Sequence, residues 1–406
     1  MSNQIKPQTL KGFRDFLPKE EVKRQYVVDK IRKIFELYGF DPLETPALEY
    51  AQTLLGKYGE ESDKLLYLFE DRGGRKIGLR YDQTVPLARV IAQYYYDLPH
   101  PFKRYQIQPV WRAENPQKGR FREFLQCDID TIGVGGIYAD TEIITCVMAV
   151  MKTLGFKKAK MLINDRSFFK NLMPKFVTAI DKLEKIGTEG VIEELIEKGM
   201  DKDQAKRFII SIDKSKPTPL ISSISKILRK NGLNENEDFE FSPSLARGLD
   251  YYTSTIFELR TSEYKSGSLG GGGRYDNLIM KFFGRKIEAV GFSFGFDRLL
   301  EAMQELQLIP QKTTSVFVLV TVFSDYYLNE SLDLATKLRT AGINTDIYLN
   351  IDLSKQLKYA DKKGIPYVVI IGPDEIKKNV VKLKNMKTGE QKETTQEKLI
   401  EILRNK

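Results

Sequence analysis

The chain has 406 residues, of which 41% are hydrophobic and 29% are charged; this balance excludes intrinsic disorder and suffices for two or three packed domains. No apolar run approaches the ~20 residues that span a bilayer, and the opening MSNQIKPQTL lacks the apolar core of a signal peptide, so we expect a cytoplasmic protein. The formal net charge of +9 favours a polyanionic partner such as a nucleic acid, although a lysine-rich surface alone accounts for it equally well.

Cysteine and histidine are too scarce for several kinds of site. With only Cys127 and Cys146 the chain cannot build a disulfide framework, and with the single histidine His100 it cannot build a His/Cys metal centre. No metal site is therefore predicted. His100 lies in the turn-like LPHP without a nucleophile motif nearby, which argues against a Ser-His-Asp or thiol enzyme.

The first predicted element is an amphipathic helix over residues 21–38, ended by Gly39. Its apolar face suggests that it covers a sheet. Pro42 and Pro46 follow in a strand-like segment, and proline is typical of an edge strand rather than of the centre of a sheet.

Residues 104–130 predict a β-hairpin in which both strands separate polar from apolar side chains with period two. The polar face of the second strand holds Arg122, Phe124, Gln126, Asp128 and Asp130, with Glu123 as an exception on the apolar face. The polar face of the first strand holds Arg104, Gln106, Gln108 and Arg112. At about 3.3 Å per residue, the run from Phe124 to Asp130 covers roughly 20 Å, enough for a nucleotide at one end and an amino acid at the other. Because a purely structural sheet needs no such face, we interpret it as the floor of a site.

The organisation changes twice after the hairpin. Residues 167–235 carry helical spacing with little strand signal and are predicted to be a helical insertion between 1–166 and 236–308. From 309 to 406 strands and helices alternate, which predicts a separate α/β domain with a mostly parallel sheet. Its lysine-rich surface suits RNA phosphates, although a solvated surface explains any single lysine as well.

The segment from Ser244 to Glu258, SLARGLDYYTSTIFE, is the most informative stretch of the chain. Arg247 opens an otherwise apolar and aromatic run and precedes Gly248, which lets the backbone approach a ligand closely. Arg247 either holds an anion or pairs with Asp250 to fix the start of a strand, and the segment alone leaves both interpretations open. Residues 253–259 alternate as a half-buried strand does.

This segment resembles the histidine-site motif of histidyl-tRNA synthetases. Three further stretches resemble class II synthetase motifs in the right order: residues 104–130, GGGGRYDNL at 270–278 and GFSFGFDRLL at 291–300. KGFRDFLP, ETPALE and DQTVPLAR near the N-terminus are similar to that family too. The resemblance implies an α+β fold: a class II synthetase antiparallel sheet flanked by helices in 1–166 and 236–308, a helical insertion, and a C-terminal α/β anticodon-binding domain.

The resemblance also implies an ATP site towards the tip of the hairpin. Arg112 would hold the α-phosphate and the substrate carboxylate, Glu114 would read the adenine edge, and Phe124 would stack on the base. Arg120 and Arg298 would hold the outer phosphates, because arginine suits the negative charge that phosphoryl oxygens carry as pyrophosphate leaves.

At the other end of the hairpin the resemblance implies a histidine site. A cationic amino acid with an imidazole ring needs an acceptor for its ammonium group and separate partners for its two ring nitrogens. Asp82, Thr84 and Gln126 match the ammonium positions, whereas Asp130 and Tyr252 match those that face the ring. The full predicted set of histidine-binding residues is Asp82, Thr84, Arg112, Gln126, Asp130, Arg247, Tyr251, Tyr252 and Tyr275. Arg247 and Arg112 are the predicted catalytic residues.

The implied activity is ATP-dependent ligation of L-histidine to tRNA(His) through a histidyl-adenylate, with release of AMP and pyrophosphate, by a homodimer that uses ATP with Mg²⁺. Gln117 is the predicted contact with the tRNA acceptor end, in a loop that carries Asn115 where many bacterial relatives have arginine. The main alternative is a histidine-sensing regulatory subunit of ATP phosphoribosyltransferase, a non-catalytic relative that lacks the C-terminal domain and parts of the motifs. A synthetase for another amino acid such as proline is disfavoured by RGLDYY and Asp130, and a general RNA-binding module leaves an ordered ATP site unexplained.

Overall fold

The computed structural model describes residues 5–56, 64–116, 119–170, 172–246, 251–265, 267–348 and 352–405. The chain divides into two compact units, Met1–Asp15 with Val27–Leu308, and Phe16–Tyr26 with Ile309–Lys406. Each unit has its own sheet and its own buried core. No helix among the described residues is long and apolar enough to cross a membrane.

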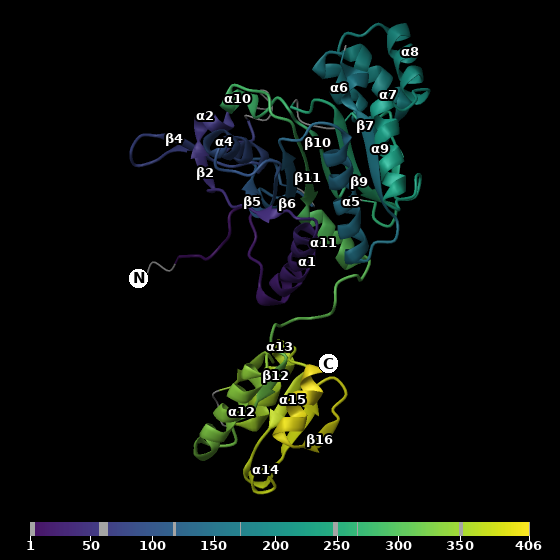
Figure 1. Cartoon of the computed structure of the whole chain (residues 1–406). Helices are drawn as coiled ribbons and strands as arrows, with labels where there is room; N and C mark the ends of the chain where they lie inside the picture. The colour runs from purple at the N-terminus through teal and green to yellow at the C-terminus, as the bar shows by residue number, and fades with distance from the viewer. Residues whose placement is uncertain are drawn as a thin grey trace. The chain divides into compact units, whose positions relative to one another are not determined.

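The first unit is built on an eight-stranded sheet (Figure 1). The strands, in spatial order, are β1 (Asp41–Pro42), β5 (Phe102–Trp111), β6 (Glu123–Ile132), β11 (Ala289–Gly295), β10 (Gly270–Arg274), β9 (Thr255–Thr261), β7 (Ala159–Asp165) and β8 (Phe239–Phe241). The six strands from β5 to β7 are antiparallel, and the two edge strands pair in parallel with their neighbours. Pro42 thus lies at the edge of the sheet, as predicted.

Helices cover the apolar face of this sheet. The helix α1 (Pro18–Leu37) buries Phe35 against Tyr105 of β5 and Phe294 of β11, with ring centroids 5.9 and 6.3 Å apart. The helix α5 (Ile137–Leu154) is joined to the same face by an ion pair from Glu142 to Lys103 of β5, at 2.8 Å. The prediction that the first helix covers a sheet is confirmed.

The remaining elements of the first unit lie around the large sheet. A three-stranded sheet has the order β2 (Leu48–Tyr50), β4 (Lys76–Leu79) and β3 (Leu68–Glu70). The flanking helices are α2 (Ala51–Leu54), α4 (Thr84–Tyr94), α10 (Met280–Phe283) and α11 (Phe296–Glu305). The helical insertion comprises η1 (Arg166–Phe169), α6 (Pro174–Ile180), α7 (Leu183–Glu197), α8 (Lys202–Asp213) and α9 (Pro219–Lys230). The helices α6, α7 and α8 form a separate lobe, whereas α9 lies beside α5 and β7 (Figure 1). This lobe has its own core, in which Phe176, Val191 and Ile209 are buried.

The hairpin of β5 and β6 has the predicted faces, and the structure adds its register. Arg104 lies opposite Asp130, and Val110 lies opposite Phe124. The exception in the pattern, Glu123, is explained by its partner across the hairpin, because its carboxylate accepts a hydrogen bond of 2.6 Å from Trp111 Nε1. At the inner end of the hairpin, the polar face is buried as deeply as the apolar face. The alternation of polar and apolar residues in the sequence does not predict this burial.

The prediction of a half-buried strand at residues 253–259 is wrong in one respect. The strand β9 begins at Thr255, and both of its faces are buried. It lies between β10 and β7 in the interior of the sheet, so alternating side chains pack on both sides.

The second unit has a five-stranded sheet with helices on both faces. Its strands, in spatial order, are β13 (Thr345–Ile347), β12 (Val318–Val320), β14 (Tyr367–Ile370), β15 (Val381–Asn385) and β16 (Gln391–Thr394). The helices are η2 (Asp325–Tyr327), α12 (Leu328–Thr340), α13 (Leu353–Lys363), α14 (Pro373–Lys377) and α15 (Gln396–Arg404). Buried residues of α12 and α15 pack with Val318 and Val320, and Ala360 of α13 packs on the opposite face with Leu319.

The prediction of a mostly parallel sheet is correct for only half of this unit. The strand β12 pairs in parallel with β13 and β14, whereas β15 pairs antiparallel with both β14 and β16. The connection from β15 to β16 is a short turn around Gly389, and so short a connection joins antiparallel strands.

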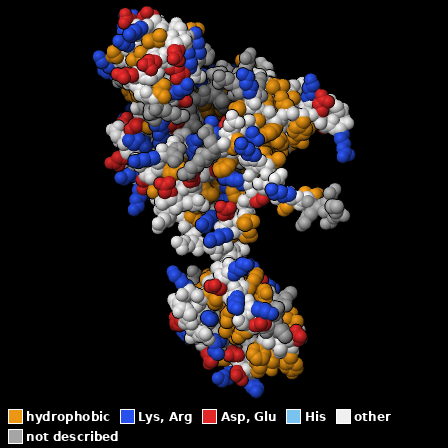
Figure 2. All heavy atoms as spheres, turned by 180° about the vertical axis from the view of Figure 1, so that it is seen from behind, with side chains coloured by type: hydrophobic (Ala, Val, Ile, Leu, Met, Phe, Trp, Pro, Cys, Tyr) orange, Lys and Arg blue, Asp and Glu red, His pale blue; other side chains and the backbone are white. Residues whose placement is uncertain are grey.

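Charged side chains of both signs are interspersed over the surface that Figure 2 shows. The net charge of +9 is therefore not gathered into one basic patch on this face.

Candidate active site

The polar floor of the β5–β6 hairpin ends in a small cavity. Five of the predicted histidine-binding residues line it: Thr84, Asp130, Tyr251, Tyr252 and Tyr275. They come from four separate parts of the first unit: the start of α4, the inner end of β6, the segment before β9 and the turn after β10. The cavity has a volume of ≈ 30 Å³, room for about two water molecules.

The carboxylate of Asp130 is the best-held group in this cavity. Its Oδ2 lies 2.7 Å from Arg104 Nη2, and its Oδ1 accepts a hydrogen bond from the Tyr275 hydroxyl. Arg104 has no exposed surface and Asp130 is 3% exposed. Burial raises the pKa of Asp130, and the Arg104 charge opposes that rise. Gly291 is required beside it, because a Cβ there would overlap the Asp130 carboxylate.

The predicted ammonium-site residues lie next to this cavity. Thr84 is the first residue of α4, and the buried Asp82 just before it accepts a hydrogen bond of 3.2 Å from the Val85 amide. Gln126 donates to Ser293 Oγ at 3.1 Å, and its Oε1 is buried with no hydrogen-bond partner in the described part of the chain. Since an ammonium group carries only donors, an acceptor of this kind suits it.

The tyrosines of the cavity supply neutral hydroxyl groups. Burial raises the pKa of Tyr251 and of Tyr275 well above 10.0, so both phenols stay protonated near neutral pH. The hydroxyls of Tyr251 and Tyr252 are 3.4 Å apart, and the rings of Tyr251 and Tyr275 meet edge to face. Such hydroxyls can donate to one ring nitrogen of an imidazole and accept from the other.

Two buried residues of the floor were not predicted as site residues. Arg104 is the counter-ion of Asp130, and Asp128 lines the cavity between Gln126 and Asp130. Burial raises the pKa of Asp128 to about 7, although Arg104 lowers it, and its Oδ1 is buried without a hydrogen-bond partner among the described residues. The period-two pattern places both on the polar face, and a register assignment for the hairpin would have paired Arg104 with Asp130.

The predicted ATP residues gather at the outer end of the hairpin. The guanidinium of Arg112 lies 5.1 Å from the centroid of the Phe124 ring, and its Nε donates to Tyr81 O at 3.0 Å. Arg120 and Glu114 face each other across the hairpin loop in an ion pair of 2.7 Å. In this structure the two side chains are therefore paired with each other.

Arg298 lies in the first turn of α11, where its Nη1 donates to Ser268 O at 3.3 Å. The hairpin loop reaches the same helix, since a Cβ on Gly119 would lie 3.6 Å from Glu301 Oε2. Arg298 and Glu301 lie about one turn apart on α11, so Arg298 is close to the hairpin loop. Gln117, Arg247 and Asp250 lie outside the described residues, so their predicted contacts are not addressed by the structure.

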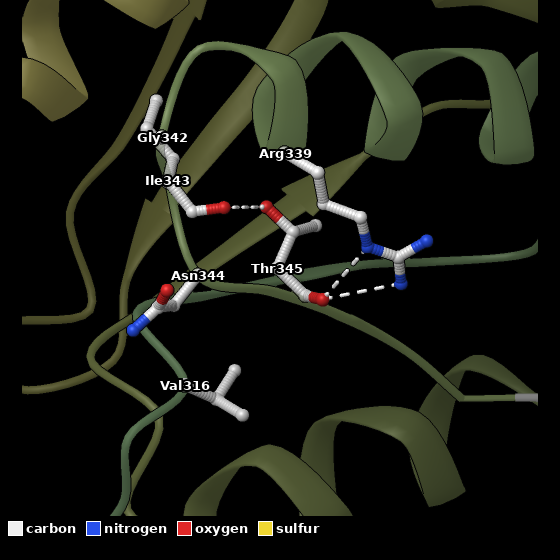
Figure 3. Close-up of a pocket in the computed structure, with 6 residues that line it drawn as sticks. All are labelled: Val316, Arg339, Gly342, Ile343, Asn344 and Thr345. Atoms are coloured by element: carbon white, nitrogen blue, oxygen red, sulfur yellow. Dashed lines mark hydrogen bonds between the residues drawn. The ribbon is translucent and has the colours of Figure 1, made fainter.

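The second unit has a hollow of its own, of ≈ 340 Å³, between the end of α12 and the start of β13 (Figure 3). Arg339 donates two hydrogen bonds to Thr345 O, at 3.2 and 3.1 Å, and the Thr345 hydroxyl donates to Ile343 O. Asn344 is held by a bond from its side chain to Ser315 O. These bonds fix the turn that lines the hollow.

Comparison with known proteins agrees with both units. A family model described as histidyl-tRNA synthetase matches residues 12–188 and 214–299, and one described as anticodon binding domain matches residues 315–406. Histidine–tRNA ligase from Cytophaga hutchinsonii is 38% identical over 451 residues, covering 98% of this chain and 99% of that protein. The one from Wolinella succinogenes is 39% identical over 422 residues, with 96% of each chain covered.

Solved structures give the same result. The crystal structure of histidyl-tRNA synthetase from Nostoc sp. PCC 7120 superposes with a TM-score of 0.86 at 30% identity, over 99% of this chain and 100% of that one. Apo histidyl-tRNA synthetase from S. aureus superposes with a TM-score of 0.71 at 26% identity, over 98% and 100% of the two chains. The fold, the ordered motifs and these relatives together place the chain in the histidyl-tRNA synthetase family.

Proposed function

We propose that this protein activates L-histidine with MgATP and transfers it to tRNA(His), as a homodimer in the cytoplasm. The observation that carries the proposal is the floor of the β5–β6 hairpin, which joins a buried carboxylate cavity at Asp130 to an arginine-rich end at Arg112. Histidine fits the first end through its ammonium and ring nitrogens. ATP fits the second through its phosphates and base.

Adenylate formation requires that negative charge on the α-phosphate be stabilised while pyrophosphate leaves. Arg112 is suited to this because its bond to Tyr81 O holds the guanidinium in place before substrate arrives. Arg247 would act beside it, Phe124 would stack on adenine and Glu114 would read its edge. Arg120 and Arg298 would take the outer phosphates, and Gln117 would contact the tRNA acceptor end.

The proposed boundary between residues 308 and 309 agrees with the division of the chain into two units, except that Phe16–Tyr26 groups with the second unit. Residues 1–166 and 236–308 would form the catalytic domain, 167–235 the helical insertion, and 309–406 the anticodon-binding domain. The regulatory-subunit alternative is not favoured, because the chain keeps Arg112, Glu114 and Arg298 together with a folded C-terminal unit.

Exposed apolar side chains support a homodimer. They gather on the three-stranded sheet, where Tyr50, Leu68 and Phe69 are 52%, 44% and 46% exposed. A monomeric protein rarely leaves so many large apolar groups together, and a two-fold partner that presents the same surface would cover them.

The direct test is ATP–pyrophosphate exchange with each of the standard amino acids. We expect histidine alone to drive the exchange, because a buried carboxylate, the Tyr275 phenol and the Tyr252 phenol together suit a ring with two nitrogens. Equal exchange with proline or threonine would refute the assignment.

Removal of the C-terminal unit should separate the two half-reactions. A chain that ends at Gln311 is expected to form histidyl-adenylate at a rate close to that of the full protein but to charge tRNA poorly, since phosphate contacts of the missing unit no longer contribute. Both rates are measured at the same salt concentration, because phosphate contacts weaken steeply with salt. Full aminoacylation by the shortened chain would show that the second unit has another role.

A further inference from the structure

Asp128 occupies the middle of the polar floor. It lies two residues from both Gln126 and Asp130 on the same face of β6, so its Cα is roughly 6.6 Å from each at the usual rise per residue. It lines the same cavity as Thr84 and Tyr252. Asp128 is 3% exposed, and its Oδ1 has no hydrogen-bond partner in the part of the chain that the structure describes.

A buried carboxylate oxygen without a partner is costly, and it needs an explanation. Two cations interact electrostatically with Asp128, Arg104 and Arg80, and neither forms a hydrogen bond to its Oδ1, although Arg104 Nε is itself buried without a hydrogen-bond partner among the described residues. Arg104 lies 2.7 Å from Asp130, and Arg80 donates to Thr45 O at 2.5 Å and to Pro109 O at 3.0 Å. Ser293, opposite Asp128 in the register of β6 and β11, offers only a hydroxyl.

Charged groups of both signs act on Asp128. Asp130 of β6 and Asp82 from the segment before α4 act on Asp128 against Arg104 of β5, and Asp128 in turn acts on Arg80. The phenols of Tyr251 and Tyr275 stay neutral. Burial, with the charges of Asp130 and Asp82, raises the pKa of Asp128 to about 7, so this carboxyl is partly protonated near neutral pH.

We propose, on the basis of the function proposed above, that Asp128 is a further histidine-binding residue whose carboxylate accepts a hydrogen bond from the ammonium group of the substrate. The proton that Asp128 carries in the free protein passes to solvent when the ammonium group enters. The ammonium assignment follows from the neighbouring Gln126 Oε1, a second buried acceptor without a partner among the described residues. Asp130 is already held by Arg104 and Tyr275, and it remains at the ring end of the cavity.

The first experiment measures ATP–pyrophosphate exchange with Asp128→Asn. The KM for histidine should rise about 10- to 100-fold, the loss expected for a hydrogen bond to a charged group, and kcat should change much less. The matched control is Asp165→Asn, which removes another buried carboxylate that bonds Ser167 N and Thr218 Oγ1 outside the site. This control should leave the KM unchanged.

A deaminated histidine, 3-(imidazol-4-yl)propanoate, identifies the group that Asp128 binds. It lacks the ammonium group, so its inhibition constant should be the same for the wild type and Asp128→Asn. An equal loss for histidine and for this analogue would place Asp128 at the ring and overturn the ammonium assignment.

The number of protons released when histidine binds is a second measurement. It would not differ between the wild type and Asp128→Asn if Asp128 had only a structural role. Calorimetric titration with histidine at pH 7, in two buffers of different ionisation enthalpy, should show more proton release by the wild type than by Asp128→Asn, because the free carboxyl has a pKa of about 7. Protonation of the free imidazole contributes equally to both proteins. The KM of the wild type should accordingly fall as pH rises through about 7, since the carboxylate form binds the cation.

Ser293→Ala keeps the proposal testable even where Asp128→Asn fails to fold. The Ser293 hydroxyl lowers the pKa of Asp128 by hydrogen bonding, so its loss should move the fall in KM to higher pH. Two outcomes would overturn the role of Asp128. One is a pH dependence of KM in Ser293→Ala that does not differ from that of the wild type. The other is an Asp128→Asn protein whose KM and proton release equal those of the wild type. A wild-type protein that does not exchange with histidine at all would instead refute the proposed function.

Discussion

Replacement of Arg112 by alanine is expected to slow the formation of histidyl-adenylate by about 10²- to 10³-fold, the scale for loss of one preorganised donor to developing charge. Arg112 is preorganised because its Nε is bound to Tyr81 O and its guanidinium lies over the Phe124 ring. Its remaining N–H groups can then meet the α-phosphate without further ordering. Single-turnover kinetics with ATP and histidine measure this step directly.

Three comparisons make the Arg112 prediction specific. Arg112→Lys should recover little, because one ammonium group cannot reproduce a planar fork that bridges carboxylate and phosphate. Arg247→Ala should slow the same step to a similar degree, whereas transfer from pre-formed adenylate to tRNA should change far less in both variants. Arg89→Ala removes a partly buried arginine that pairs with Glu49 away from the site, and it should leave adenylate formation intact. A folded Arg112→Ala protein that activates histidine at the wild-type rate would exclude the catalytic role.

The hairpin could be predicted in detail because its signal is local. Period-two alternation fixes which residues of each strand share a face, and the structure confirms the hairpin with the predicted polar face. The wrong prediction for the second unit had a different origin. Alternating strands and helices indicate parallel pairing, but the last two strands are separated by only a short turn, and the direction of such a pair depends on the length of that turn.

For the candidate site the sequence yields positions, five of which line one cavity, but not the contacts between them. The resemblance named Asp130 and Tyr275 without indicating that they bond to each other, and it named Glu114 and Arg120 without indicating that they pair. Such contacts depend on strand register and on burial, which are properties of the folded chain. Asp128 was not predicted as a binding residue because its polar character marks only a face of a strand, whereas its partnerless buried oxygen is visible only in three dimensions.

The second prediction with a large effect concerns Asp130. Asp130→Ala is expected both to abolish measurable histidine activation at ordinary substrate concentrations and to lower the free energy of unfolding by about 3 to 5 kcal/mol, because it leaves a buried charge without its partner. The charge in question is Arg104, which has no exposed surface and lies 2.7 Å from the Asp130 carboxylate. The loss of histidine binding predicted from the sequence is therefore accompanied by a loss of stability.

A double variant separates the two effects of Asp130. Replacement of Arg104 by methionine together with Asp130→Ala removes the stranded charge, and removal of both members of a buried ion pair is often neutral for stability. We expect the free energy of unfolding of the double variant, measured in urea, to return towards that of the wild type. The KM for histidine should stay raised, because the imidazole ring has still lost the Asp130 carboxylate and the Tyr275 hydroxyl has lost the acceptor that orients it. Recovery of histidine activation together with stability would show that Asp130 serves only to neutralise Arg104. Recovery of stability alone would establish that the same carboxylate holds the fold and the substrate.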